Sequence, residues 1–216
     1  MIPNRPFRRE PQGARGRLLE AGVRLVREQG YAATSVDQLC TAAGVTKGAF
    51  FHHFASKEAL GVALADYWSE STGGFFAEAP YHHHARALDR LLGYIDLRLA
   101  LIGGPPEQFS CVAGTLLQEN FRSSPAIRSA CEASIMGNAH AIEADIAEAL
   151  ADHDLPGDMA PGLARHVQTV IQGAFVLAKS QAPDQSATMA REAVGHLRRY
   201  FELLFNAGPQ GETSCA

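Results

Sequence analysis

The sequence lacks the features of several large classes of protein. No apolar run approaches the roughly 20 residues that span a bilayer, so we expect no membrane segment. The first ten residues contain three arginines and no apolar stretch, which is unlike a secretory signal, and we therefore expect a cytoplasmic location. The four cysteines form no C-x-x-C pair, so neither a zinc-finger spacing nor a redox dithiol motif is present.

Motifs of catalysis are also missing. The chain has no G-x-G-x-x-G, no phosphate loop, no H-E-x-x-H and no G-x-S-x-G. We therefore expect that the protein is not an enzyme and has no cofactor. The alternative is an enzyme of unknown type, in which Cys111 as the nucleophile would need a base that the sequence does not identify. The run His82-His83-His84 would point in three directions on a helix, so we expect no metal site there.

Charge is distributed unevenly along the chain. The net charge is −4, but residues 1–57 carry nine basic and four acidic side chains, whereas the remainder carries ten basic and nineteen acidic ones. A basic head on an acidic body is expected where one end of a protein meets phosphates.

The apolar pattern is helical throughout, and no segment alternates as a strand would. We expect helices from Ala14 to about Gly30, from Ser35 as N-cap to Gly44, from Thr46 as N-cap, and from Ser56 as N-cap. Later helices are expected at about 82–102, 109–121, 126–153, 161–181 and 186–206, between breaks at glycine and proline. The predicted fold class is all-α, with an N-terminal three-helix helix-turn-helix domain and a larger helical domain for ligand binding and dimerisation.

The segment 35–54 predicts the function. Two helices of about eight residues around a tight turn have helix-turn-helix geometry. If Phe50 and Phe54 point inward, the outer face of the second helix carries Lys47, small residues, Phe51 and two histidines, which suits a major groove. Predicted DNA-binding residues are Ser35, Thr46, Lys47, Gly48, Ala49, Phe51, His52, His53 and Lys57.

Residues 30–60, from Gly30-Tyr31 through Ala43-Gly44-Val45-Thr46 to Lys57-Glu58-Ala59-Leu60, resemble the signature of the TetR family of transcriptional regulators at nearly every defined position. The resemblance implies an all-α dimer with a DNA-binding head and a ligand domain. It implies DNA contacts from Thr46, Lys47, Ala49, Phe51, His52 and His53, with Ser35 and Lys57 on flanking phosphates. Phe51 departs from the commoner tyrosine, which removes one hydroxyl.

The domain boundaries follow from these assignments. We expect a disordered basic arm at 1–11, the helix-turn-helix domain at 12–72, the effector-binding and dimerisation domain at 75–207, and a disordered tail at 208–216. The last two helices carry apolar stripes, and the resemblance implies that they join two subunits, which would present two recognition helices to a palindromic operator.

The second domain is expected to hold a small-molecule effector. A mainly apolar pocket with a few polar groups would suit one, and plain core packing is the alternative for each residue. Candidate pocket residues are Tyr67, Trp68, Phe109, Cys111, Gln118, Gln172 and Phe175.

Cys111 stands near a predicted helix start, where the helix dipole would favour its thiolate and make it reactive. The alternative is a small buried apolar residue. Cys40 is expected in the core, Cys131 has no motif, and Cys215 falls in the tail.

These features predict a transcriptional repressor that leaves its operator on binding a small-molecule effector or on thiol modification. A helical DNA-binding protein without an effector is the other alternative.

Overall fold

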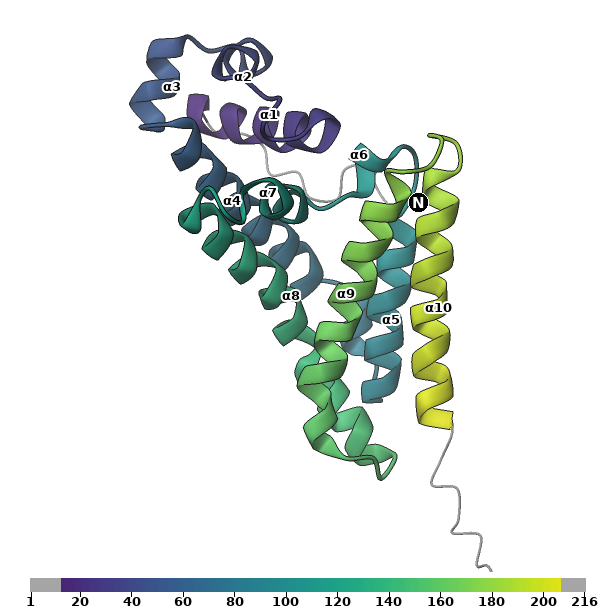
Figure 1. The fold of residues 1–216 in the computed structure, drawn as a ribbon. Helices are drawn as coiled ribbons and strands as arrows, with labels where there is room; N and C mark the ends of the chain where they lie inside the picture. Colours follow the sequence, from purple (N-terminus) through teal and green to yellow (C-terminus); the bar gives the residue numbers. More distant parts are fainter. Residues whose placement is uncertain (1–12, 207–216) are drawn as a thin grey trace, which may run out of the picture. The chain divides into compact units, whose positions relative to one another are not determined.

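The computed structural model describes residues 13–206, and its regular structure is entirely helical (Figure 1). That range holds ten α-helices and two short 3-10 turns and no strand, which confirms the predicted all-α class. The arm at 1–11 and the tail at 208–216, with Cys215, lie outside the described residues. Within that range, none of the helices combines the length and apolar composition needed to cross a membrane.

The helices form two compact units. Unit 1 comprises the described residues up to Glu78 together with residues 105–137. Its helices are α1 (Gly13–Gln29), α2 (Val36–Ala43), α3 (Lys47–His53), α4 (Lys57–Ala77), α6 (Pro106–Phe109), α7 (Val112–Asn120) and the first half of α8 (Pro125–Asp152). The central element is α1, which contacts α2, α3, α4, α6 and α7.

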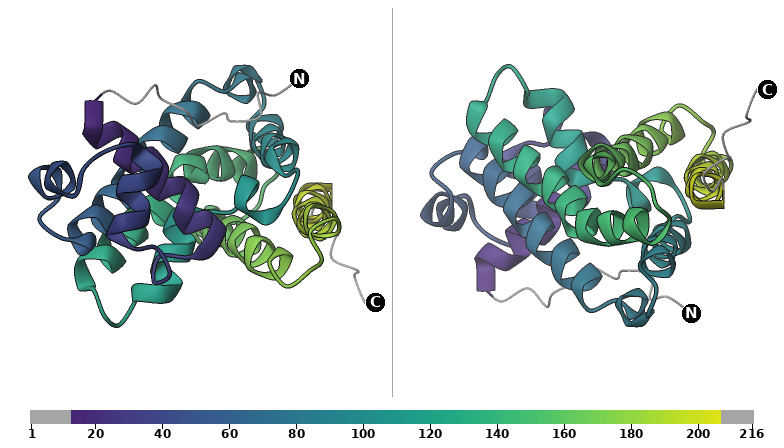
Figure 2. Two further views of the ribbon diagram at one scale, coloured as in Figure 1. Left: turned by 90° about the horizontal axis from the view of Figure 1, so that it is seen from above. Right: turned by 90° about the horizontal axis from the view of Figure 1, so that it is seen from below.

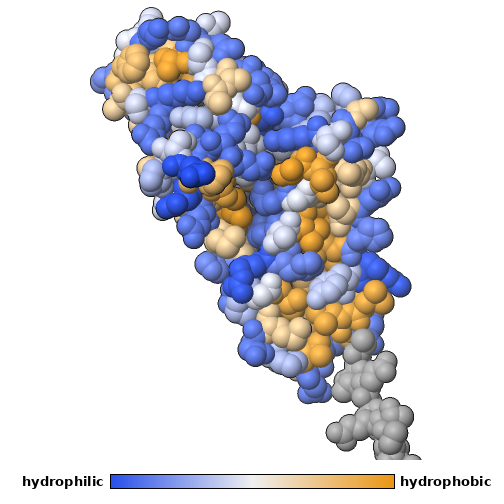
Figure 3. All heavy atoms as spheres, viewed as in Figure 1, coloured by the Kyte–Doolittle hydropathy of each residue, from blue (hydrophilic) through white to orange (hydrophobic). Residues whose placement is uncertain are grey.

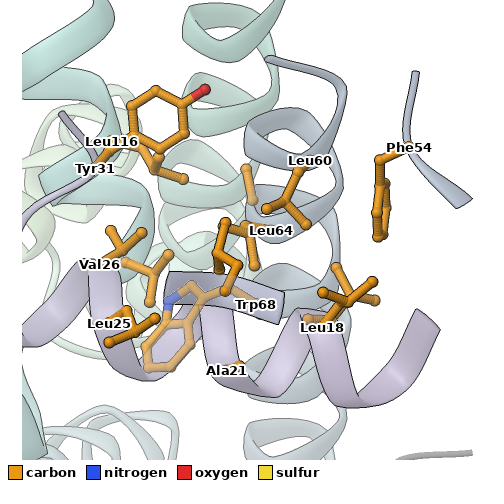
Figure 4. Packing of buried hydrophobic residues seen from close by; sticks show 14 of the residues in the cluster. Leu18, Ala21, Leu25, Val26, Tyr31, Phe54, Leu60, Leu64, Trp68 and Leu116 are labelled. Atoms are coloured by element: carbon orange, nitrogen blue, oxygen red, sulfur yellow. The ribbon is translucent and has the colours of Figure 1, made fainter. Parts of the chain in front are cut away.

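The core of unit 1 lies between α1, α4 and α7. Leu60 and Leu64 of α4 face α1, and the Trp68 ring lies beside Leu25 (Figure 4). Burial of each leucine contributes about 1.5–3 kcal/mol. Gly61 allows α4 to approach α8, because a Cβ there would lie 2.6 Å from Cδ1 of Ile127.

Unit 2 comprises residues 79–104 and the described residues from Asn138 onward. Its elements are η1 (Pro80–His83), α5 (Ala87–Leu101), the second half of α8, η2 (Gly157–Met159), α9 (Ala160–Ala178) and α10 (Ser186–Asn206). Helix α10 packs against α9 and α5. The views in Figure 2 look nearly along the axis of α10. Inside this unit the buried Tyr94 hydroxyl accepts hydrogen bonds from Arg98 (Nη2, 2.7 Å) and Gln168 (3.1 Å).

Two predicted helix starts were wrong. The helix expected from residue 82 begins at Ala87, because Pro80 starts a 3-10 turn that ends at His83. The helix expected from residue 109 begins at Val112, and the four-residue α6 precedes it, with Pro106 at its first position. The later boundaries agree within three residues, and α10 matches the expected 186–206.

The two units group the chain differently from the predicted domains at 12–72 and 75–207, because residues 105–137 pack with the N-terminal helices. The functional division stays a prediction.

Candidate nucleic-acid interface

The ends of α2 are fixed by local hydrogen bonds. The Ser35 Oγ accepts from the Gln38 N–H at 3.2 Å, and the Gln38 Oε1 accepts from the Ser35 N–H at 2.8 Å. This is the predicted capping box. At the other end Gly44 adopts the left-handed conformation (φ 61°), and its N–H and that of Val45 donate to the last carbonyls of α2. The turn between the two helices is therefore set by the backbone.

The second helix, α3, presents one face to the core and one to solvent. Thr46 caps it, since its Oγ1 accepts from the Ala49 N–H at 3.1 Å. Phe50 and Phe54 are buried as predicted, with ring centroids 5.8 Å apart. Phe51, by contrast, is 52% exposed and lies on the outer face of the helix. Two short capped helices with such an outer face define a helix-turn-helix unit.

The predicted contact residues lie close together on that unit. Ser35, Thr46, Lys47, Gly48, Phe51 and His52 are exposed, whereas Ala49, His53 and Lys57 are half-buried. The imidazole rings of His52 and His53 are 5.0 Å apart. The Ser35 and Thr46 hydroxyls accept cap hydrogen bonds and keep their own protons to donate to a phosphate.

Lys47 is already paired with a carboxylate. Its Nζ lies 2.8 Å from Oδ1 of Asp37, on the first turn of α2, and both side chains are largely exposed. The hydrogen bond to Asp37, and then its charge, raise the pKa of Lys47. An exposed ion pair of this kind is weak, so a phosphate or a base can replace the carboxylate.

Lys57 belongs to a cluster around the turn that precedes α2. Its Nζ lies 4.3 Å from the centroid of the Tyr31 ring, and the Tyr31 hydroxyl donates to the Lys57 carbonyl at 2.9 Å. Glu119, at the end of α7, accepts from the Tyr31 N–H at 3.1 Å and from the Ala32 N–H at 2.6 Å. Burial lowers the pKa of Lys57, and the charge of Glu119 opposes that shift.

Gly30 is required beside this cluster. Its φ is +88°, and a Cβ on it would lie 2.6 Å from the Glu119 Oε1. Glycine is the residue that adopts this conformation without cost. The turn between α1 and α2 is thus tied to α7.

Sequence reasoning missed Asp37, Glu119 and Arg17, whose Nε donates to the Ala43 carbonyl at 3.0 Å. Only the capping pattern around Asp37 gave a local signal. Glu119 is 88 positions from Tyr31, and no motif marks that contact.

The candidate effector residues are divided between the units. Five lie in unit 1 and two, Gln172 and Phe175, in unit 2. Trp68, Phe109 and Phe175 are buried, whereas Gln118 is exposed on α7. A shared pocket for these residues stays a prediction.

Cys111 is the N-cap of α7, and its Sγ accepts from the Gly114 N–H at 3.4 Å. It is half-buried, whereas Cys40 and Cys131 are buried. Burial raises the pKa of the Cys131 thiol to about 12, and it also raises that of Cys40. Among the described residues, no cluster of histidine, cysteine and carboxylate side chains could hold a metal ion.

Residues 18–64 match the family model described as "Bacterial regulatory proteins, tetR family". The chain is 37% identical over 71 residues to the transcriptional regulator AcuR of Cereibacter sphaeroides, covering 30% of this chain and 32% of that protein. It is 32% identical over 80 residues to the HTH-type transcriptional repressor NemR of Escherichia coli, covering 37% and 40%. These matches span about a third of the length of the curated relatives.

Likeness in fold extends much further. A TetR transcriptional regulator from Chloroflexus aurantiacus matches with a TM-score of 0.72 and 25% identity, over 90% of this chain and 97% of that one. Residues 18–64 thus match the TetR family in sequence, and the chain as a whole is similar in fold to TetR regulators. The relatives and the solved structure named here are all described as transcriptional regulators or repressors.

Proposed function

We propose that the protein is a sequence-specific DNA-binding transcriptional regulator that acts as a repressor. The outer face of α3 carries this proposal, since Lys47, Phe51 and His52 are exposed on a short helix whose two ends are fixed. Lys47 suits a guanine edge or a phosphate, and Phe51 suits a thymine methyl group. Such a protein works beside the chromosome, so the proposal includes a cytoplasmic location.

The regulator acts as a homodimer through α9 and α10. Most of the apolar stripes on these helices are buried within the protomer, including Val167 and Leu197. Other large apolar residues are left exposed, and Figure 3 shows apolar surface along α9. They are Val176, Leu177, Tyr200 and Leu203. Two copies joined there would read a palindromic operator with half-sites roughly 34–36 Å apart.

A mobility-shift titration on the upstream region of its own gene tests DNA binding. The wild type should bind specifically and more weakly at higher salt, and Lys47→Ala should weaken binding and reduce the salt dependence. Arg128→Ala, which removes an exposed charge from α8 and from neither α3 nor the proposed dimer helices, is the matched control and should leave binding unchanged. A Lys47→Ala variant that binds like the control would contradict the assignment of α3.

Release from the operator has two candidate triggers. A small-molecule effector would favour a conformation in which the two heads no longer match the half-site spacing. Modification of Cys111 is supported by its position at the start of α7 and by the deep burial of Cys40 and Cys131. Release by an electrophile that persists in Cys111→Ser would exclude the thiol trigger. A regulator that has no effector would stay bound to its operator in the presence of either a small molecule or an electrophile.

A further inference from the structure

Arg27 is the one basic side chain among residues 13–206 whose buried nitrogens have no hydrogen-bond partner. It lies in the last turn of α1, and its guanidinium stacks on the Trp68 ring at 5.1 Å. The two nitrogens are Nε and Nη2, which are shielded from solvent. Their N–H groups point in the same direction and form the edge of a guanidinium that grips a carboxylate with two parallel hydrogen bonds.

An unpaired edge of this kind is unusual. Buried donors are nearly always satisfied, and a buried charge needs a partner more than a neutral group does. Burial lowers the pKa of Arg27 to about 10, against the opposing charges of Cys111 and Glu107. Glu107 is near enough to act on the charge of Arg27, but Nε and Nη2 have no hydrogen-bond partner among the described residues.

The neighbouring segment offers a second unpaired group. Ser110 stands between Glu107 and Cys111, is 1% exposed, and its Oγ has no hydrogen-bond partner. It directly precedes the Cys111 cap of α7, a nine-residue helix whose N-terminus favours negative charge. Both α6 and α7 pack against α1. All three groups belong to unit 1, and Cys111, next to Ser110, is near enough to Arg27 to act on its charge.

We propose that the Nε–Nη2 edge of Arg27 binds the carboxylate of a small organic acid, and that Ser110 and the start of α7 complete the site. The guanidinium lies over the Trp68 ring, and an aromatic face of this kind limits the freedom of the arginine side chain. The ligand enters when α6 moves away from α1, because the edge is closed to solvent and α6 is a single turn of four residues.

This site would give the proposed regulator an effector-binding group on the DNA-binding head itself, and that consequence rests on the proposed function. Arg27 is three residues from Gly30, where the turn held by Glu119 begins. A ligand that binds better when α6 is displaced shifts the head toward that conformation, by no more than its preference between the two states.

Trp68 is the only tryptophan in the chain, and it touches the proposed site, so its fluorescence reports directly on binding. We would titrate the full chain with sodium acetate, benzoate and octanoate at constant ionic strength, with benzamide as the uncharged match for benzoate. At least one carboxylate should give a saturable change, and benzamide should give none. No saturable change with any of the three, or an equal change with benzamide, would overturn the proposal.

Variants locate the binding group. Arg27→Gln should weaken carboxylate binding at least tenfold, and Arg27→Lys should also weaken it, since a lysine keeps the charge without the planar fork. Arg24→Gln removes an exposed arginine one turn earlier on α1 and should bind like the wild type. Wild-type binding in both Arg27 variants would overturn the proposal.

Folding and DNA binding are checked separately. Thermal unfolding of each variant shows whether the fold survives, and if Arg27→Gln fails to fold, Arg27→Lys carries the test. If carboxylates change Trp68 fluorescence but no operator binds, the proposed function fails while the site stands. If the operator binds but no carboxylate does, the site fails alone.

Discussion

Glu119 holds the turn between α1 and α2 through both of its carboxylate oxygens, and replacing it with glutamine tests what that hold contributes. In Glu119→Gln one oxygen still accepts a hydrogen bond, but the amide nitrogen then faces a second N–H donor. A hydrogen bond to a charged acceptor is worth about 1.5–3 kcal/mol when shielded. Because Glu119 is exposed, we expect a loss of about 1–2 kcal/mol, which is roughly a 5–30-fold change in an equilibrium.

The assay is amide hydrogen exchange at Tyr31 and Ala32, followed by operator binding. Exchange at these two amides should speed up by about that 5–30-fold factor. Operator affinity should fall by no more than the same factor, since only molecules with an ordered turn bind. Glu132→Gln, which removes an exposed carboxylate from α8, is the control for charge alone. Unchanged exchange in Glu119→Gln would refute the reasoning.

Three further predictions concern single contacts. Asp37→Asn should free Lys47, so that operator binding tightens and its dependence on log salt steepens by about one unit; an unchanged slope would contradict this. Gly61→Ala should lower the free energy of unfolding by about 1–2 kcal/mol through overpacking, and adding Ile127→Val, which removes the clashing methyl group, should restore most of it in denaturant titrations. The Cys131 thiol should resist iodoacetamide at pH 8 in the folded protein. The free energy of unfolding should fall as the pH rises from 9 toward 12, because the thiol ionises near 9.0 in the unfolded chain and near 12 in the folded one. Alkylation of the folded protein at the rate of the denatured chain would contradict the raised pKa.

The recognition helix could be predicted from sequence because its determinants are local. The Ser35 and Thr46 caps, and glycine at the end of α2, each act within a few residues, and all three were confirmed. The resemblance over residues 30–60 added the predicted contact face, because that face lies on one short helix.

The remaining parts of the site depend on contacts that no local pattern encodes. Glu119 binds a turn far away in sequence, and Arg27 on an ordinary amphipathic helix gave no sign of its buried edge. The predicted start of α5 was wrong because the apolar period continues across Pro80–His83, where the proline backbone imposes a 3-10 turn. The candidate effector residues could be named from the sequence, but whether they line one pocket could not be predicted. The helical period of a sequence does not say which helices face one another.

Unit 1 is built from two separate stretches of chain. During synthesis it therefore cannot complete its fold when only the first stretch has been made. Residues 105–137, which fill the space beside Gly61 and hold the turn at Tyr31, are made only after the whole of α5. Until then the apolar faces of α1 and α4 stay uncovered, and a nascent chain in that state is prone to aggregate. A fragment cut after α4 has the same defect permanently, so chimeric regulators made by exchanging heads should carry α7 and the start of α8 with them.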